Sequence, residues 1–188
     1  MPAQTRRPLA NAPAPITSMT RRTDLAPDVR NLAAHSPTLV SALAPLPDGQ
    51  IATGEAGHGS YYKPDGRRIV LDRADHPDRA ALLQTLAHEA GHVHHHATTG
   101  IDPSVEGALR DEGAAQLTNL RVVDELRAAG ETESVGVAGG NGRLKRNLAR
   151  DAGERVGAEA AIGDWIGDHE HPSTHPHLTY REYYGGVR

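Results

Sequence analysis

The sequence Leu86-Ala87-His88-Glu89-Ala90-Gly91-His92 combines two histidines and a glutamate at a spacing that indicates a particular helix. His88 and His92 are four positions apart, so on an α-helix they lie on one face, about one turn from each other. Two imidazoles at that spacing suit a single metal ion, and Glu89 lies close enough to reach a water on the metal without being a ligand itself. The stretch predicts a metal-binding helix with His88 and His92 as ligands.

The flanking residues give this helix its limits. Pro77 is typical of a helix start, Asp78 places negative charge in the first turn, and Gly100 is a natural stop. We therefore expect the helix to begin at Asp75–Pro77 and to end near Gly100. One face carries apolar side chains at helical spacing, namely Leu82, Leu83, Leu86, Ala90 and Val93.

The segments on either side predict a small sheet and further helices. Residues 59–63 and 67–72 are the predicted strands of a hairpin, because Pro64-Asp65-Gly66 between them is a turn sequence in which the glycine supplies a positive φ. The other expected elements are a short helix within 31–46, a long helix over 103–129, a glycine-rich loop over 130–142, a third helix over 144–165 and an irregular end over 169–188. The expected fold class is α+β, a helix-dominated domain with a small antiparallel sheet before the metal-binding helix.

Composition restricts the kind of metal site and the class of protein. The 188 residues include 12 histidines and no cysteine, which excludes a disulfide scaffold, a thiolate zinc site, an iron–sulfur cluster and a cysteine nucleophile. A metal must therefore bind to nitrogen and oxygen, a ligand set that suits zinc as well as manganese, cobalt or nickel. The net charge of −4 gives no support to a nucleic-acid partner. The sequence contains neither an apolar run of about 18 residues, which a membrane span needs, nor a secretory signal peptide.

Residues 1–35 differ in composition from the rest of the chain. They contain two arginine pairs, prolines that interrupt any helical or strand period, and no acidic residue before Asp24. Such a segment buries too little apolar surface to offset the entropy of ordering it. We expect residues 1–35 to form a disordered leader, either an export or targeting segment or a tail without function, and residues 36–188 to form one folded domain.

The His-Glu-x-x-His stretch resembles the motif of zincin metallopeptidases, which implies one catalytic zinc ion with three protein ligands and Glu89 as general base. The long form of that motif requires a glycine and a third histidine at positions that His95 and Thr98 occupy here, so it is excluded. Glu112 lies 20 positions after His92 on the next predicted helix. This resembles the gluzincin arrangement, which implies Glu112 as the third ligand in a zincin-like fold.

Small residues near Glu112 favour this assignment. Gly91 lies in the metal-binding helix, and Gly113-Ala114-Ala115 follow the glutamate. A glycine inside a helix costs about 1 kcal/mol relative to alanine, and close packing of two helices would offset that cost. Asp111 and Glu106 are rival ligands, although Asp111 is shorter and lies about 100° away around the helix.

Two parts of the expected site stay open. Thermolysin-like enzymes have an aspartate four positions after the ligand glutamate to orient a zinc-bound histidine, but here that position is Gln116, and Asn119 is the other candidate. For the donor to the developing oxyanion we select Tyr180 and His177. The remaining candidates for that role are Tyr61, Tyr62, His175, Tyr183 and Tyr184.

Two further segments carry hypotheses. His94-His95-His96 is either a solvated or weakly metal-binding helix end, favoured by the negative end of the helix dipole, or a regulatory metal site. His96 is about 12 Å along the helix from His88, too far to share its metal. The strand over 68–72 is either an edge to which an extended peptide substrate adds or a plain structural hairpin.

A looser resemblance covers residues 55–130. The order of Tyr61-Tyr62-Lys-Pro-Asp-Gly, the strand Ile69–Asp72 and the metal-binding helix is similar to small bacterial effector and toxin metallopeptidases with a minimal zincin core. This implies a zinc-dependent endopeptidase that is secreted by a non-classical route and acts on a protein or peptide substrate, with a secretion chaperone or an immunity protein as partner. Two alternatives are an intracellular regulatory peptidase that cleaves a repressor and a non-catalytic His-rich module that binds a metal or a partner.

Overall fold

The computed structural model describes Met19 and residues 22–75, 78–131 and 135–186. Its described helices are α2 (Pro27–Ala33), α3 (Pro37–Leu43), α4 (Arg79–Thr99), α5 (Val105–Ala128), α6 (Gly142–Ala152), α7 (Arg155–His169) and α8 (Tyr180–Tyr184). Its strands are β1 (Ile51–Thr53), β2 (Tyr61–Lys63) and β3 (Arg68–Leu71), with short 3-10 turns at Pro64–Gly66 and Arg73–Asp75. This arrangement confirms the coarse α+β class. Within the described part of the chain, no helix combines the length and the apolar character needed to cross a membrane.

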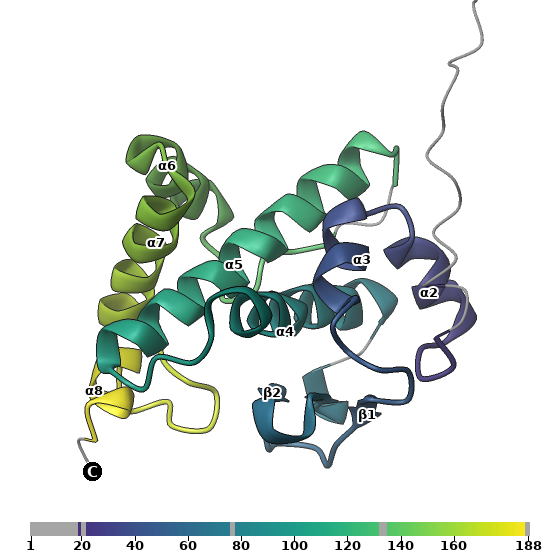
Figure 1. The fold of residues 1–188 in the computed structure, drawn as a ribbon, viewed down its shortest axis with the longest axis horizontal. Helices are drawn as coiled ribbons and strands as arrows, with labels where there is room; N and C mark the ends of the chain where they lie inside the picture. Colours follow the sequence, from purple (N-terminus) through teal and green to yellow (C-terminus); the bar gives the residue numbers. More distant parts are fainter. Residues whose placement is uncertain (1–18, 20–21, 76–77, 132–134, 187–188) are drawn as a thin grey trace, which may run out of the picture.

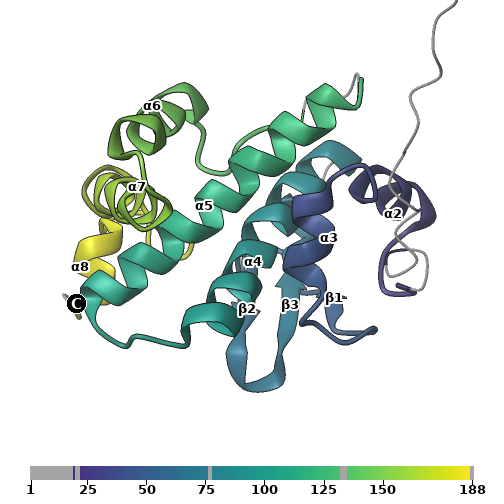
Figure 2. The ribbon, with the colours of Figure 1, turned by 45° about the horizontal axis from the view of Figure 1, so that its top comes forward.

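Helix α5 runs between two packed parts of the molecule (Figure 1, Figure 2). In one part, α2, α3, the sheet and α4 share an apolar core, to which α5 contributes Val122 and Val123. In the other part, Leu120 of α5 belongs to a separate apolar cluster with Ile162 of α7. Because α5 belongs to both, it fixes the position of each part relative to the other.

Helix α4 forms where the sequence predicts it but begins later. Asp78 is the N-cap, and its side chain accepts a hydrogen bond from the backbone N–H of Ala81, which satisfies one free donor of the first turn. The predicted start at Asp75–Pro77 is wrong, because Asp75 ends a 3-10 turn and the first helical residue is Arg79; Pro77 lies outside the described residues. Gly100 ends the helix as predicted, with a φ of 80°.

Glycines allow α4, α5 and α7 to approach one another closely. A Cβ on Gly91 of α4 would lie 2.9 Å from the carbonyl oxygen of Ala115 in α5, and closer still to the Cα of Ala115. A Cβ on Gly113 of α5 would lie 2.8 Å from the backbone nitrogen of Gly163 in α7. These distances leave no room for a side chain at either glycine. The close packing predicted from Gly91 and the small residues after Glu112 is therefore present between α4 and α5.

The sheet is mixed, whereas the sequence predicts an antiparallel one. The hairpin of β2 and β3 forms with Tyr62 opposite Ile69, but β1, which the sequence does not predict, pairs in parallel with β3. The strand order β1-β3-β2 makes β3 the central strand, so the hypothesis that residues 68–72 offer an edge to a peptide is wrong. The positive φ of the turn lies at Arg67 and not at Gly66.

The second half of the chain contains more helix boundaries than predicted. The second long helix is present as α5, but the third predicted helix is divided into α6 and α7 at Gly153, whose φ of 74° is incompatible with a continuous helix. Helix α8 lies within the end predicted to be irregular. It begins with a capping box, in which the side chains of Thr179 and Glu182 each bind the other's backbone N–H.

The folded part begins before the predicted boundary at residue 36. Helices α2 and α3 each have a proline in the first turn, where its missing N–H leaves no hydrogen bond unmade. Met19 and Val29 are buried in the core, and the buried Arg22 donates to backbone carbonyls at the end of α3 and in the turn after it. The predicted disorder is therefore wrong for Met19 and residues 22–35, whereas residues 1–18 and 20–21 lie outside the described residues.

Candidate metal site

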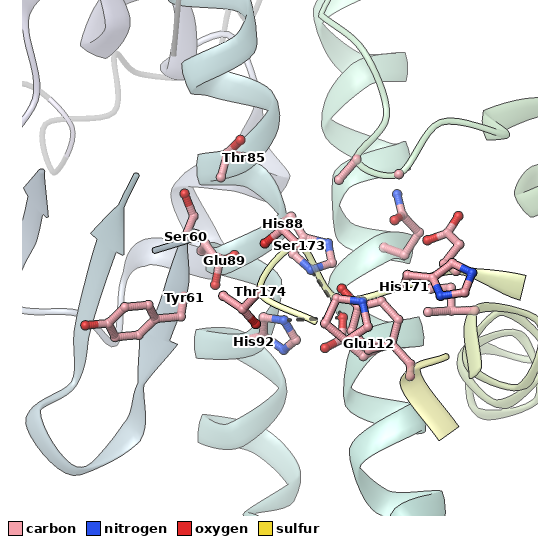
Figure 3. A pocket seen from close by; sticks show the side chains of 18 of the residues that line it. Ser60, Tyr61, Thr85, His88, Glu89, His92, Glu112, His171, Ser173 and Thr174 are labelled. Carbon is pink, nitrogen blue, oxygen red and sulfur yellow. Dashed lines mark ion pairs between the residues drawn. The ribbon is translucent and has the colours of Figure 1, made fainter. Parts of the chain in front are cut away.

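A cleft of about 1000 Å³ opens with α4 and β2 on one side and α5, α7 and α8 on the other. Figure 3 shows His88, Glu89 and His92 extending from α4 and Glu112 extending from α5 toward them. All five tyrosines of the chain line the cleft, and its described lining contains no lysine or arginine. Imidazoles, carboxylates and phenols therefore provide the chemistry of this cleft.

His88, His92 and Glu112 come together as the sequence predicts. One potential ligand atom from each lies within 4.8 Å of the other two. The Oε2 atom of Glu112 is 3.4 Å from His88 Nε2 and 3.8 Å from His92 Nε2. A tetrahedral ion with bonds of about 2.0–2.1 Å holds its ligand atoms about 3.4 Å apart. The spacing thus fits a metal ion held by all three side chains, after a small inward movement of His92.

Asp111 contacts the other ring nitrogen of His92. Its Oδ2 atom is 2.9 Å from His92 Nδ1 and 2.8 Å from His96 Nε2. Burial lowers the pKa of His92, but the carboxylates around it, Asp111 first among them, outweigh this effect and raise the pKa to about 10. Burial raises the pKa of Asp111, but His92 and His96 lower it more strongly, so this carboxyl group stays ionised.

Neither rival ligand joins the three converging side chains. Asp111 lies on the Nδ1 side of His92, where a carboxylate fixes the orientation and the protonation of a metal-binding imidazole. Glu106 is exposed and does not line the cleft. Among the described residues, the donors that could share a metal are His88, His92 and Glu112 alone.

Glu89 is buried beside the two histidines, with 5% of its surface exposed, and it lines the cleft. Burial raises the pKa of this carboxyl group overall, although positive charge on His92 and His88 lowers it in part. A carboxylate with a raised pKa is well suited to accept a proton near neutral pH. The carboxyl group of Glu89 thus lies buried beside the two histidines at the cleft, and its role as a general base stays a prediction.

The predicted oxyanion donors lie in different places. Tyr180 lines the cleft, but His177 does not; it is exposed, and its ring packs near that of His175. The hydroxyl of Tyr184 donates a hydrogen bond of 2.6 Å to Glu112 Oε1. Burial raises the pKa of both Tyr180 and Tyr184, so both phenols keep their protons. The structure thus brings Tyr180 to the site, leaves His177 outside it, and gives Tyr184 a role that we did not select from the sequence.

Gln116 and Asn119 do not orient a histidine of the site. They bond to each other, and Gln116 also accepts a hydrogen bond of 3.2 Å from the fully buried Lys145. The ammonium group of Lys145 pairs with Glu170 at 2.7 Å, and Glu170 lines the cleft. Burial lowers the pKa of Lys145, and the carboxylate of Glu170 offsets only part of this effect. Sequence reasoning missed this ion pair because its members come from α6 and from the residue that follows α7.

The histidine run is less solvated than expected. His95 is buried, while His94 and His96 are partly buried. The ring of His96 lies 5.5 Å from that of Tyr62, in addition to the contact of its Nε2 with Asp111. The interpretation of a solvated helix end is therefore wrong for His95 and His96.

Comparisons of the chain with protein families, with curated proteins and with solved structures found no match. The assignment of a function therefore depends on the motif in α4 and on the geometry of the cleft. The observation to be explained is a set of three converging donors with a buried carboxylate beside them.

Proposed function

We propose that this chain is a zinc-dependent endopeptidase with a gluzincin-like ligand set. The observation that supports this most is the convergence of His88, His92 and Glu112 within 4.8 Å, with the buried Glu89 beside them in an open cleft. The histidine pair is a local feature of one helix, but the glutamate comes from a second helix. Such a convergence between helices is what a three-ligand hydrolytic site requires.

Zinc bound by these side chains would supply a Lewis acid that polarises a peptide carbonyl and lowers the pKa of water toward 7. Glu89 would accept the proton of the attacking water and return it to the leaving amine, as its burial and raised pKa favour. Tyr180, which lines the cleft and keeps its proton, would donate a hydrogen bond to the developing oxyanion.

Other side chains would hold the ligands in position. Asp111 contacts His92 Nδ1 and so leaves Nε2 directed toward Glu112. Tyr184 binds Glu112 Oε1 and leaves Oε2 on the side of the two histidines. Contacts of this kind restrict the ligand rotamers before the metal binds, which strengthens metal binding.

The shape of the cleft favours a peptide substrate. Strand β2 is at one edge of the sheet, and Tyr61 and Tyr62 on it line the cleft. An extended peptide could pair with this edge through main-chain hydrogen bonds. Strand β2, and not residues 68–72, is therefore the edge that we propose for pairing with an extended peptide.

The test compares metal content and peptide cleavage for the wild type and Glu89→Gln. We expect both proteins to bind one equivalent of zinc, and we expect Glu89→Gln to cleave a proteome-derived peptide library about 100-fold more slowly or worse. Glu106→Gln, an exposed change outside the cleft, is the matched control and should cleave like the wild type. Equal cleavage by Glu89→Gln and the wild type, or a zinc-loaded wild type that cleaves no peptide, would refute the proposal.

Secretion as a bacterial effector or toxin, and a secretion chaperone or immunity protein as partner, stay predictions that follow from the resemblance. The regulatory peptidase would share every residue of the site, so cleavage of a library does not separate it from a secreted enzyme. The non-catalytic His-rich module differs in outcome, because it predicts zinc binding without cleavage by any variant.

A further inference from the structure

A second hollow, of about 280 Å³, lies where α3, α4, α5 and α7 meet. It shares no lining residue with the cleft. His94 lines it and is two positions after His92 on α4, so the two side chains lie on different faces of that helix. The described lining residues are Pro37, Thr38, Ser41, Ala42, His94, Ala114, Leu117, Thr118, Arg121, Arg155 and Glu159.

Basic side chains from three helices line this hollow, namely His94 of α4, Arg121 of α5 and Arg155 of α7. The one carboxylate of the lining, Glu159, is buried and pairs with Arg155 at 2.7 Å. Arg121 is exposed and has neither an ion pair nor a side-chain hydrogen bond within the described part of the chain. Even with His94 neutral, the lining carries a net positive charge and one guanidinium whose donors are unused.

The hydroxyl groups that line the hollow also differ in whether they have a hydrogen-bond partner. Thr38 donates to Glu125 and Thr118 donates to the carbonyl of Ala114. Ser41 is exposed, and its hydroxyl has no hydrogen-bond partner among the residues that the structure describes. A ligand in the hollow therefore meets a free hydroxyl as well as a free guanidinium.

These charges disfavour the regulatory metal site suggested by the histidine run. A metal cation at His94 would meet the repulsion of Arg121 and Arg155, and the one carboxylate present already pairs with an arginine. An anion gains from the same charges. Helix α7 also begins at Arg155 without a side-chain cap, so the positive end of its dipole adds to the attraction.

We propose that this hollow binds a small oxyanion of the phosphate type, with Arg121, Arg155 and Ser41 as its donors. A guanidinium donates two parallel N–H groups to oxygens of a phosphate, a geometry that lysine does not offer. A volume of about 280 Å³ accepts a phosphate ion or the phosphate group of a small monoester. This site is independent of the metallopeptidase function proposed above.

The test is a calorimetric titration of the full chain with inorganic phosphate at constant ionic strength, repeated with glycerol phosphate and with acetate. We expect saturable binding of phosphate and a Kd about tenfold higher for Arg121→Gln. Arg127→Gln is the matched control, because Arg127 is also exposed on α5 but does not line the hollow; it should bind like the wild type. Arg121 is the residue chosen for substitution since it supports no other side chain, whereas Arg155 partners a buried glutamate.

The results of the titrations distinguish free phosphate from a phosphate monoester as the ligand, and the hollow from the cleft as its site. Binding of both phosphate and glycerol phosphate identifies a site for monoesters, whereas binding of phosphate alone identifies a site for the free ion. The variant also distinguishes the hollow from a metal in the cleft, because Arg121 does not line the cleft. Unchanged phosphate binding by Arg121→Gln, equal affinity for acetate, or no binding by the wild type would overturn the proposal.

Discussion

Replacing Gly91 by alanine should separate the two helices that supply the metal ligands. A Cβ at this position would lie 2.9 Å from the carbonyl oxygen of Ala115, against about 3.5–4.0 Å for an ordinary contact. Both the oxygen and the still closer Cα of Ala115 belong to the backbone, so no side-chain rotation relieves the overlap. Helices α4 and α5 must therefore move apart by a substantial fraction of an ångström.

Two opposing effects give the expected size of the change. Alanine is the better helix former by about 1 kcal/mol, but overpacking costs about 1–3 kcal/mol, and a backbone contact belongs at the upper end. We expect Gly91→Ala to lower the free energy of unfolding by about 1–2 kcal/mol as the difference of these terms. Because Glu112 lies across the same contact from His88 and His92, zinc affinity should also fall about tenfold or more.

Urea unfolding followed by circular dichroism and competition with a chromophoric chelator measure the two effects. Gly157→Ala is the matched control, since its Cβ would lie 3.3 Å from the oxygen of Ala152, so the change in stability should stay within about 1 kcal/mol. If Gly91→Ala were stabilised by about 1 kcal/mol, as for a glycine in an exposed helix, and kept its zinc affinity, the close backbone contact between α4 and α5 would be contradicted.

Three more substitutions test other parts of the structure. Lys145→Met leaves the partly buried Glu170 without its partner and should cost about 3 kcal/mol in urea unfolding, part of which the added change Glu170→Gln recovers; a loss no greater than that of an exposed lysine would contradict this. Tyr184→Phe removes the hydrogen bond to Glu112 and should lower zinc affinity about tenfold in the chelator assay, an expectation that an unchanged affinity would refute. Burial raises the pKa of Asp24, but its arginine partner and a backbone N–H lower it overall. Its contribution is therefore complete at neutral pH and is lost as the pH falls through its folded-state pKa, which lies below 3.8. Asp24→Asn should accordingly be less stable than the wild type at pH 7 by about 1–3 kcal/mol and approach it near pH 2, and a difference that stays constant with pH would contradict the ion pair.

The metal helix could be predicted because its information is local. Spacing of four residues places His88 and His92 on one face whatever the rest of the chain does. The prediction of Glu112 as third ligand needed two further signals, namely the resemblance to gluzincins and the small residues on both helices, such as Gly91 and Ala115. The close contact of α4 and α5 shows why those residues are small.

The separate roles of the adjacent residues Asp111 and Glu112 in α5 could not be predicted from the sequence. Asp111 and Glu112 differ by about 100° around the helix, and only the rotation of α5 against α4 decides which one faces His92 Nε2 and which faces Nδ1. That rotation depends on packing against both α4 and α7. Asp111 thereby contacts His92 in the place where Gln116 was expected to act.

The errors at the N-terminus and in the sheet have different causes. Pro27 is one of the prolines from which the sequence predicts a disordered leader, although proline is favoured in the first turn of a helix, where it lies. Strand β1 has three residues, and its neighbour in the sheet, β3, comes only after β2 along the chain, so no short-range pattern marks β1. The burial of Lys145 also depends on residues far away in the sequence, since its partners come from α5 and from the end of α7.

X-ray absorption spectroscopy at the zinc edge, on the purified wild type and Glu112→Ala, measures directly whether Glu112 completes a metal site with His88 and His92. We expect one equivalent of zinc, with two imidazole nitrogens at about 2.0–2.1 Å and a carboxylate oxygen at about 2.0–2.2 Å. In Glu112→Ala we expect loss of that protein oxygen and a lower zinc affinity, with the signal of both histidines retained. The same first coordination shell in both proteins, or a wild type that binds no zinc, would contradict the site formed by His88, His92 and Glu112.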